Sequence, residues 1–592
     1  MIIGQRIGLR FRKSNTQDNI VVSQHDGINI QLDKFDKKSS EVKDGELWCC
    51  EVLKHFRYFT VVKAIDLVQD SQGITITDLS QIAPPESTAT VSEIKKETFA
   101  PSKYQIAVTD FAKKGKGNAA INAVAGSGKS TTLKMILESL PKNKSILMAA
   151  FNRDIVEDLT EKVKHITNAE VTTWHSFGYR ALRYQFKSEI DKQKYVNIAK
   201  MLFETIEIFD EEIDKFDYMI RCVRLCELAR LNLANSSKEI ERLAEINLVE
   251  ILENECQIAY QLMEIGKKDI TKIDYCDMLY LPLVHNVKVK TYDFVLCDEA
   301  QDQNNCQREL MKRTMKKLSG RFIAVGDPRQ AIYLFAGSSS DSFYQILDIP
   351  NTIELPLSIC YRCDAAIVNE AKTLVPYIEA RDNAPKGEIN KDADIADIKD
   401  GDMVLCRNTA PLIKLCYKFL RQGVKAYVQG KDIGINLISL IKSTKKQDIG
   451  EMLDKLKLES EKILKNLMRK HGLLEKEARE HQTFESFLEK IDIIGILSES
   501  CETAEDVIKN IQYIFDDKTK DGIRFSTIHR SKGLENDRVF LIQPNLLPSK
   551  RSMRSPELMK QEYNLQYVAI TRAKHYYGVI GEDKFDIYKK AK

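Results

Sequence analysis

The spacing of hydrophobic and polar residues changes along the chain and divides it into parts. In residues 1–95, short runs alternate apolar and polar side chains, which is typical of strands with one buried face. These runs, separated by polar turns, are IGLRFR, NIVVSQ, GINIQL, ELWCCEVL, YFTVVKAIDLV and ITITDL. They predict a small β domain, barrel-like or of the OB type. The polar, proline-bearing residues 84–102 predict a linker behind it.

From residue 103 onward, apolar runs of strand length alternate with stretches of helical spacing. This order predicts an α/β architecture with doubly wound parallel sheets. Long helical stretches interrupt the order at about 180–270 and at about 441–520, and we expect both to be helical insertions. Their charged runs are typical of solvated helix faces, so we assign them no chemistry.

The composition fits a protein built from several such units. The chain has 592 residues, of which 43% are hydrophobic and 30% are charged. This length exceeds what one hydrophobic core usually supports. The net charge of +3 gives no overall positive field, so a nucleic-acid site would have to be a local patch.

The N-terminal residues and the cysteines favour a location inside the cell. Arginines interrupt MIIGQRIGLRFRK too early for a signal peptide, and no apolar run approaches the roughly 18 residues of a membrane span. Thirteen cysteines are scattered through apolar stretches, and Cys360-x-x-Cys363 is the only CxxC, without a second pair to complete a zinc set. We therefore expect buried, reduced thiols in a soluble, cytoplasmic protein of a bacterial or phage-infected cell, with no membrane partner.

The segment NAVAGSGKST, residues 122–131, departs by one residue from the phosphate-loop pattern G-x-x-x-x-G-K-[ST], because Ala123 stands where the first glycine is expected. An apolar run before the turn predicts a strand, and TTLKMILESL behind it predicts a helix whose N-terminus faces an anion. Lys129 would reach the β- and γ-phosphates, and Ser130 would hold Mg²⁺. A glycine-rich turn without a ligand is the alternative. The nucleotide-binding residues predicted here are Ala125, Gly126, Ser127, Gly128, Lys129, Ser130 and Thr131.

A second motif decides between these alternatives. In YDFVLCDEAQD, residues 292–302, the apolar run FVLC ends in Asp298 and Glu299. Carboxylates at the C-terminal end of a parallel strand lie where ligands bind, so Asp298 can hold Mg²⁺ and Glu299 can orient or deprotonate the attacking water. Together the two motifs predict an NTPase.

A third segment, FIAVGDPRQAIYLFAG at 322–337, again places polar residues after an apolar strand. Gln330 in this segment is suited to sensing the γ-phosphate. Tyr333 and Phe335 offer ring faces on which bases can stack, although the same two rings also fit a hydrophobic core.

Five segments of the chain, taken in order, resemble the ATPase and DNA motifs of the UvrD/Rep-like helicases of superfamily 1. These segments are AVAGSGKST, DEAQD, GDPRQAIYLFAG, STIHRSKGLE (526–535) and EYNLQYVAITRAK (562–574). The resemblance covers roughly residues 102–440 and 521–582. The runs AAFNRDI and EYNLQYVAITRAK look closest to the F-box DNA helicase branch, and in the second of them we expect an aromatic-rich strand before TRAK.

The resemblance implies two RecA-like domains, at 96–350 and 351–592, with ATP and Mg²⁺ bound between them. It implies that Gln105 reads the adenine edge and that Tyr361 packs on the adenine. Arg362 and Arg572 would touch the γ-phosphate from the second domain, where planar guanidinium groups suit the charge of phosphoryl transfer. Glu535 in KGLE would contact the ribose.

The resemblance also implies binding of single-stranded DNA with little sequence preference, through aromatic stacking. The residues that match single-strand contacts are Phe151, Thr173, Trp174, His175, Tyr333, Phe335, Thr527 and His529. An RNA substrate stays open, because stacking does not discriminate the sugar.

Four positions depart from the family pattern. Thr131 follows the phosphate loop where the family often has arginine, Ala336 and Phe335 replace the arginine and tryptophan of IYxWRG, and Asn564 replaces an arginine. The insertion at 441–520 is also much smaller than the regulatory subdomain of UvrD or Rep, so we do not expect their autoinhibition.

The sequence therefore predicts an ATP-dependent helicase that moves 3′ to 5′ on single-stranded and tailed duplex DNA. A translocase that strips proteins from single strands and a non-motor, ATP-switched DNA-binding module are the alternatives. Residues 1–95 have no counterpart in the family, and they fit an OB-type DNA platform, a docking domain for replication or recombination proteins, or a purely structural domain. The residues suited to the platform are Arg6, Arg10, Arg12, Lys54, His55, Arg57, Tyr58 and Phe59.

Overall fold

The protein is described from a computed structural model, which divides into two compact units. One unit comprises Met1–Ala100 and Pro548–Tyr563, and the other comprises Pro101–Leu547 and Asn564–Lys592. In the first hundred residues the structure describes the strands at 6–13, 21–23, 29–32, 47–55 and 59–69, together with residue 100. Beyond them it describes residues 101–586 apart from 206–214, 248, 250, 333–340, 471–473, 480, 516–520 and 550–551.

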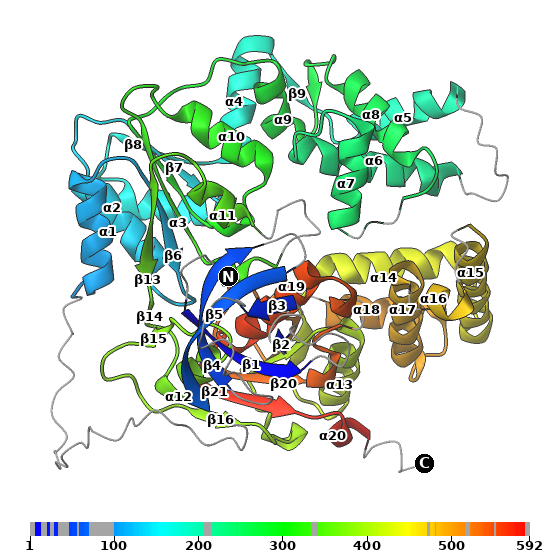
Figure 1. Ribbon diagram of the computed structural model, residues 1–592. Coiled ribbons are helices and arrows are strands. Elements are labelled where there is room, and N and C mark those ends of the chain that lie inside the picture. Colours follow the sequence, from blue (N-terminus) through cyan, green and yellow to red (C-terminus); the bar gives the residue numbers. More distant parts are fainter. Residues whose placement is uncertain are drawn as a thin grey trace, which may run out of the picture. The chain divides into compact units, whose positions relative to one another are not determined.

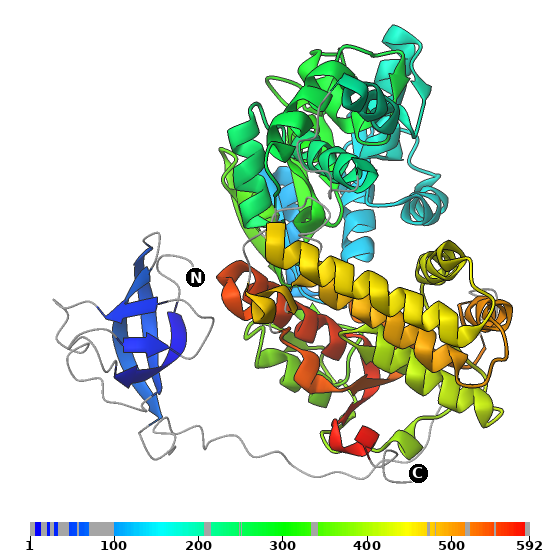
Figure 2. The ribbon, with the colours of Figure 1, turned by 90° about the vertical axis from the view of Figure 1, so that its right-hand side faces the viewer.

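The N-terminal strands form one five-stranded sheet in the order β2-β1-β4-β5-β3, drawn in blue in Figure 2. Strand β4 pairs antiparallel with both β1 and β5, and β3 pairs parallel with β5. The strands are β1 (Arg6–Lys13), β2 (Val21–Ser23), β3 (Asn29–Leu32), β4 (Leu47–His55) and β5 (Phe59–Gln69). The predicted strand ITITDL lies outside the described residues, and the closure of the sheet into a barrel stays a prediction.

In the larger unit, a first six-stranded parallel sheet has the order β13-β6-β12-β11-β7-β8 (Figure 1). Its strands are β6 (Asn118–Ala123), β7 (Ile146–Ala150), β8 (Ala169–Thr173), β11 (Phe294–Cys297), β12 (Arg321–Gly326) and β13 (Thr352–Leu357). Alternate residues of a strand face opposite sides. In β11, accordingly, Phe294 and Leu296 join one hydrophobic core and Val295 and Cys297 join another.

Helices cover both faces of this first sheet. One core packs against α1 (Lys103–Lys114), α2 (Lys129–Ser139) and α3 (Arg153–Val163). The other packs against α4 (Trp174–Phe186), α10 (Asn305–Thr314) and α11 (Ser342–Leu347). The same core extends into a helical region made of α5 (Lys194–Thr205), α6 (Lys215–Leu231), α7 (Ser237–Ile246), α8 (Glu255–Gly266) and α9 (Asp277–Val284).

A second six-stranded sheet, also parallel, has the order β16-β21-β20-β17-β19-β18. Its strands are β16 (Glu388–Asn390), β17 (Met403–Cys406), β18 (Ala426–Val428), β19 (Ile523–Thr527), β20 (Asn536–Ile542) and β21 (Ala573–Ile580). Between β18 and β19 the chain forms α14 (Lys431–Thr444), α15 (Ile449–Lys470), α16 (Glu475–Arg479), α17 (Gln482–Ser498) and α18 (Ala504–Ile514), seen in Figure 2. Two sheets with only parallel neighbours confirm the predicted α/β class.

The cores of the second sheet follow the same alternation. Val404 and Cys406 of β17 pack toward α13 (Thr409–Arg421), whereas Met403 and Leu405 pack toward α12 (Ala365–Lys372) and α19 (Pro556–Ile570). None of the helices in the described part of the chain is both long and apolar enough to cross a bilayer.

The strand expected before TRAK is wrong, because the run EYNLQYVAI lies within the helix α19. Leu565, Tyr567, Val568 and Ile570 in this run are all buried. The burial of consecutive residues removes the spacing that separates a helix from a strand in the sequence. The strand instead follows TRAK's first residues, as β21.

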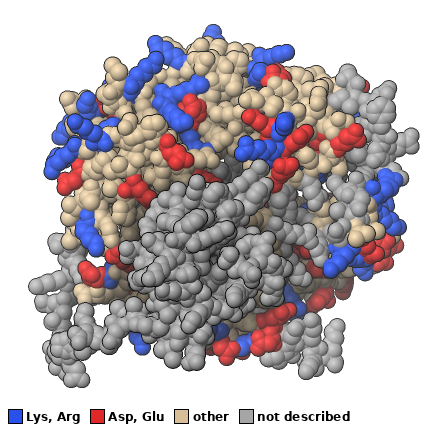
Figure 3. Space-filling view, viewed as in Figure 1, with Lys and Arg blue, Asp and Glu red and all other residues tan. Residues whose placement is uncertain are grey.

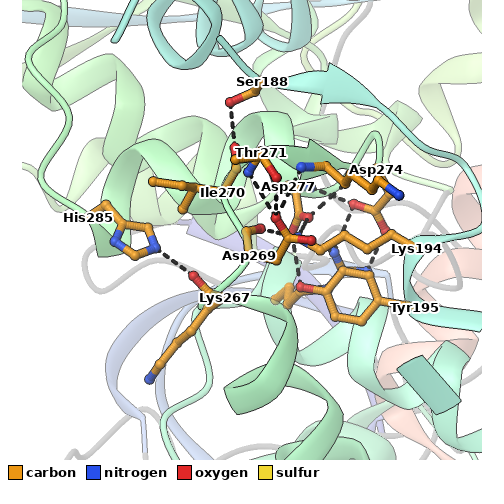
Figure 4. Close-up of polar contacts among 12 residues, drawn as sticks. Ser188, Lys194, Tyr195, Lys267, Asp269, Ile270, Thr271, Asp274, Asp277 and His285 are labelled. Atoms are coloured by element: carbon orange, nitrogen blue, oxygen red, sulfur yellow. Dashed lines mark hydrogen bonds and ion pairs between the residues drawn. The ribbon is translucent and has the colours of Figure 1, made fainter. Parts of the chain in front are cut away.

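A buried network of charges ties the helical region together (Figure 4). The Asp277 carboxylate accepts hydrogen bonds from Lys194 Nζ at 2.5 Å, from the Tyr195 hydroxyl at 3.0 Å and from Arg230 Nη1 at 2.9 Å. Arg230 also donates to both oxygens of Asp274, at 2.8 Å each. Asp277 has no exposed surface and Arg230 is 1% exposed, so α5, α6 and α9 depend on these pairs.

We predict that Asp277→Ala destabilises the helical region by about 3–5 kcal/mol, because it leaves Lys194 buried without its carboxylate partner and removes one of the two carboxylates that bind Arg230. Hydrogen exchange of α5, α6 and α9 measures this change. The matched control is Asp158→Ala, which removes an exposed ion pair with Lys162 on α3. Equal exchange in the two variants would contradict a stabilising role for the network.

Candidate nucleotide site and nucleic-acid contacts

The phosphate loop connects β6 to α2, as the sequence predicts. Gly126 and Gly128 have positive φ values of 68° and 77°, which glycine adopts without steric cost. A Cβ atom on Gly126 would lie 2.6 Å from Arg362 Cβ, so this glycine also permits a close approach of the second sheet's chain. Ala123, in contrast, is a buried residue of β6 with no positive φ. Alanine is therefore compatible with the first position of the motif.

The loop has polar groups available for a ligand. Ser127 is buried, and its Oγ has no hydrogen-bond partner among the described residues. Ser130 and Thr131, in the first turn of α2, are exposed. An unpaired buried hydroxyl beside a free helix N-terminus fits a phosphate group.

The predicted carboxylates lie at the C-terminal end of β11 and reach the phosphate loop. Lys129 Nζ lies 2.7 Å from Glu299 Oε1. Glu299 has a φ of 49°, an uncommon value for a residue with a side chain, and its N–H donates to Asp298 Oδ1 at 2.9 Å. The two motifs, 170 residues apart in the sequence, thus form one site.

Burial and neighbouring charges drive the pKa values of the two carboxylates apart. Burial and the charge of Glu299 raise the pKa of Asp298 to about 6. Burial also opposes ionisation of Glu299, but Lys129 and Lys532 outweigh it and hold the pKa of Glu299 at about 2. Burial lowers the pKa of Lys129, but Glu299 and Asp298 outweigh it, so the net pKa is raised and the ammonium stays charged. Adjacent acids with separated pKa values are typical of functional sites.

Gln330 connects the third motif to the second. Its Nε2 donates to Asp327 Oδ2 at 2.7 Å, and the Asp327 N–H donates to Gln301 Oε1 at 2.9 Å. Gln301 Nε2 in turn donates to Glu299 Oε2 at 2.5 Å. Gln301 was not singled out from the sequence, although it stands within DEAQD.

Two arginines from the part of the protein that contains the second sheet lie beside this site. Arg572 is buried and donates to the carbonyls of Val568 and Leu534 at 3.0 and 2.9 Å, and to Gln330 Oε1 at 3.4 Å. Burial and the nearby Arg362 guanidinium lower the pKa of Arg572 to about 10.

Arg362, the other arginine, is held by two contacts from its own side of the site. Its Nε lies 2.7 Å from Glu535 Oε2, and its Nη1 donates to the Thr571 carbonyl at 3.1 Å. Glu535, predicted to contact ribose, therefore pairs with an arginine predicted to contact phosphate.

Lys532 joins the two sheets and was missed in the sequence. Its Nζ forms a buried ion pair with Asp302 of DEAQD, and it donates to the Gln330 carbonyl at 2.8 Å. The residue lies in STIHRSKGLE, three positions before Glu535. A lysine inside a motif taken to bind DNA was the available signal.

The residues predicted for adenine lie next to the loop. Gln105 caps α1 with Ser102, is buried, and donates from Nε2 to Thr132 Oγ1 of α2 at 3.3 Å. The Tyr361 N–H donates to the Gly126 carbonyl at 2.8 Å. Val124 and Ala125 share a hydrophobic core with residues of the second sheet. The Ala125 N–H also donates to the Tyr567 hydroxyl at 2.9 Å.

The residues of the first sheet that are predicted to contact DNA lie at or just after the C-terminal ends of the neighbouring strands β7 and β8. Phe151, after β7, is 46% exposed. Thr173, at the end of β8, caps α4 by accepting from the Ser176 N–H at 3.1 Å. Trp174 is only 4% exposed and packs edge-on against Phe177, so its ring face is covered by protein. His175 is half-buried, and burial lowers its pKa.

The remaining predicted contacts divide between described and undescribed residues. Thr527 ends β19, His529 follows two residues later, and both are half-buried. Tyr333 and Phe335 lie outside the described residues. Asn564, which replaces a family arginine, donates to the Ala331 carbonyl at 2.9 Å just before that undescribed stretch. On the face seen in Figure 3, lysine and arginine are interspersed with aspartate and glutamate.

A phosphate loop that faces paired carboxylates at the ends of parallel strands defines the P-loop NTPase class. Comparison with known families agrees. The UvrD/REP helicase N-terminal domain matches residues 60–348, and the UvrD-like helicase C-terminal domain matches residues 522–580. The chain therefore belongs to the UvrD/Rep helicase family, as the sequence motifs indicate.

Curated relatives carry the same names. The chain is 26% identical to a probable DNA helicase II homolog of Mycoplasma pneumoniae over 46% of its length and 42% of the relative's. It is 25% identical to F-box DNA helicase protein 1 of Schizosaccharomyces pombe over 77% of its length and 54% of the relative's. It is 23% identical to ATP-dependent DNA helicase Rep of Buchnera aphidicola over 44% of its length and 42% of the relative's. The chain thus spans about half the length of the curated relatives it matches.

We predict that Lys532→Ala weakens the contact between the loop after β19 and the first sheet. Asp302 is left buried without its cation, which costs about 3–5 kcal/mol of stability. Hydrogen exchange of residues 300–303 and 527–535 measures this loosening. The control, Lys446→Ala, removes a solvent-exposed pair with Glu451. If exchange in the two segments rises no more than in the control, Lys532 does not hold the sheets together.

Proposed function

We propose that this protein is an ATP-dependent DNA helicase that moves 3′ to 5′ on single-stranded DNA and on tailed duplexes. The observation that carries the proposal is a single site built from both parallel sheets. Lys129 and Glu299 come from the first sheet, whereas Arg362, Arg572 and Lys532 come from the second. A nucleotide bound there would hold the two sheets together, so its hydrolysis would let them separate.

The chain's own groups can be assigned roles in this reaction. Gln105 and Tyr361 would bind the adenine, Glu535 the ribose, and residues 125–131 the phosphates. Ser130 and Asp298 would hold Mg²⁺, which neutralises phosphate charge when bound.

Hydrolysis would depend on the groups around the γ-phosphate. Glu299 has a low pKa and is ionised, so it can orient or deprotonate a water. Arg362 and Arg572 would stabilise charge on the transferred phosphoryl group. Gln330, which contacts both Asp327 and Arg572, would report the state of the γ-phosphate.

For DNA we propose contacts from Phe151, Thr173, His175, Thr527 and His529, all at or just after the C-terminal ends of strands. Tyr333 and Phe335 are proposed as stacking residues on the basis of the sequence. Trp174 would require its ring face to become exposed. Residues 1–95 are proposed to bring the protein to its preferred DNA or to a replication or recombination partner.

A second candidate is a translocase that removes bound proteins and unwinds little. The observation that favours it is the short helical insertion between β18 and β19, which spans α14 to α18. A non-motor DNA-binding module switched by ATP is less well supported, because the residues for hydrolysis are present.

We predict that Lys129→Ala abolishes ATP hydrolysis, because the phosphates lose the cation of the loop and Glu299 loses the ammonium group with which it pairs. Steady-state ATP turnover with single-stranded DNA measures the effect, and circular dichroism checks the fold. Lys134→Ala, on the same helix with a partly exposed Glu138 pair, is the control. Turnover like that of the unmodified protein in Lys129→Ala would refute the site.

We expect strand displacement on 3′-tailed duplexes and none on 5′-tailed or blunt duplexes, with ATP hydrolysis rising strongly on addition of single-stranded DNA. Parallel measurement of displacement, of protein removal from single strands and of ATP turnover separates the candidates. Protein removal without displacement would favour the translocase. Hydrolysis indifferent to DNA and RNA would reject both motor candidates and favour a switch or a protein-directed ATPase.

A further inference from the structure

Cys360 is the last residue of β14 (Ile359–Cys360), and Cys363 lies in the turn between β14 and α12. The Cys363 N–H donates to Cys360 Sγ at 3.4 Å. Both side chains are fully buried. The Cys363 backbone therefore lies against the Cys360 sulfur, so the two cysteines are neighbours in the fold as well as in the sequence.

The two thiols differ from each other and from the other described cysteines. A hydrogen bond with the Cys363 thiol lowers the pKa of Cys360 to about 7. Burial opposes this shift, whereas backbone N–H groups and the charge of Arg362 add to it. The same hydrogen bond, with burial, raises the pKa of Cys363. For the nine other cysteines between residues 222 and 501, burial raises the pKa. A thiolate beside a protonated thiol is the arrangement of a reactive pair.

The turn that carries the pair also touches the nucleotide site. A Cβ on Gly126 would lie 3.1 Å from Cys360 Sγ, so the sulfur sits directly against the phosphate loop. Tyr361 and Arg362, between the two cysteines, bond to the Gly126 carbonyl and to Glu535 and Thr571. The Cys363 thiol also contacts the Thr571 carbonyl at 3.8 Å, next to Arg572. A change in the turn would therefore reach the loop and both arginines.

We propose that Cys360 and Cys363 are a redox pair, which a peroxide converts to a disulfide, and that this disulfide lowers ATP hydrolysis by shifting Tyr361 and Arg362. The Cys360 thiolate attacks one peroxide oxygen, the O–O bond breaks, and a sulfenic acid forms with release of water after protonation. The Cys363 sulfur then attacks the Cys360 sulfur, its proton and the hydroxyl leave as a second water, and the S–S bond forms. The thiols lose two electrons, which the peroxide gains.

Bound nucleotide would protect the pair from oxidation. Both sulfurs are covered by the phosphate loop and by the second sheet's core, so peroxide needs the loop to move away from the turn. A nucleotide that holds the loop against Arg362 opposes this movement. Oxidation is therefore expected to be slower with a nonhydrolysable ATP analogue than without it.

The test treats the whole protein with hydrogen peroxide, with and without the analogue, and maps the cysteines after tryptic digestion without reductant. Trypsin cleaves after Arg362, so the peptides carrying Cys360 and Cys363 stay joined only through a disulfide. ATP turnover is measured before oxidation, after it, and after dithiothreitol. A displacement of about 1 Å can cost about 10²-fold in rate, so we expect turnover to fall at least about tenfold and to recover on reduction.

Serine variants test whether the loss of ATP turnover on oxidation comes from this pair of cysteines. In Cys360→Ser and in Cys363→Ser, the ratio of oxidised to reduced turnover is expected to stay near one, whatever the turnover of the reduced variant. Cys501→Ser, at a lone and partly exposed cysteine, is expected to lose turnover on oxidation like the unmodified protein.

Three results would overturn the proposal: peptides that are not joined, a joined pair with unchanged turnover, or an equal loss in both serine variants. The activity readout rests on the proposed ATPase function, whereas the peptide readout does not. Absence of turnover in the reduced, unmodified protein would refute the proposed function and the effect on hydrolysis, while the joined peptides would still report the redox pair.

Discussion

The contact between Lys129 and Glu299 is the interaction on which the site depends, because it joins the phosphate loop to the carboxylates in a place largely shielded from water. Charges in such a place are costly unless they are paired. Pairing continues outward from this contact: Gln301 donates to Glu299, Lys532 neutralises Asp302, and hydrogen bonds link Gln301 through Asp327 to Gln330. The ends of β11 and β12 and a loop of the second sheet are therefore mutually dependent, although they lie far apart in the sequence.

Local chemistry explains what the sequence could predict. Two motifs can be recognised from about ten consecutive residues: a glycine turn between a strand and a helix, and two acids at the end of an apolar strand. Lys129, Asp298 and Glu299 could therefore be predicted, together with the parallel α/β class. Lys532 was missed because its partner Asp302 is 230 residues away. The helix α19 was mistaken for a strand because its run of consecutive buried residues has no periodicity that distinguishes the two.

For some charged residues, the sequence predicted exposure to solvent where the structure shows burial. The insertion at about 180–270 was expected to carry solvated charges, yet Lys194, Arg230 and Asp277 in and beside it form a buried network. Composition cannot separate a paired, buried charge from a solvated one, because the partner that makes burial tolerable comes from another helix. The same limit applies to Trp174, whose place in the hydrophobic core depends on Phe177 and its neighbours rather than on its motif.

The two arginines illustrate how the fold could prepare a site for an anion. Arg572 is fixed by carbonyl groups of its own chain segment, and Arg362 is fixed by Glu535 and the Thr571 carbonyl. Both guanidinium groups are thus held in place by contacts of the second sheet's chain, and their mutual repulsion contributes to the lowered pKa of Arg572. An anionic phosphate between the sheets would offset that repulsion, whereas an uncharged ligand would not. Under the proposed function, the energy gained when the γ-phosphate meets these arginines would favour closure of the sheets, and loss of that phosphate would restore the repulsion that favours opening.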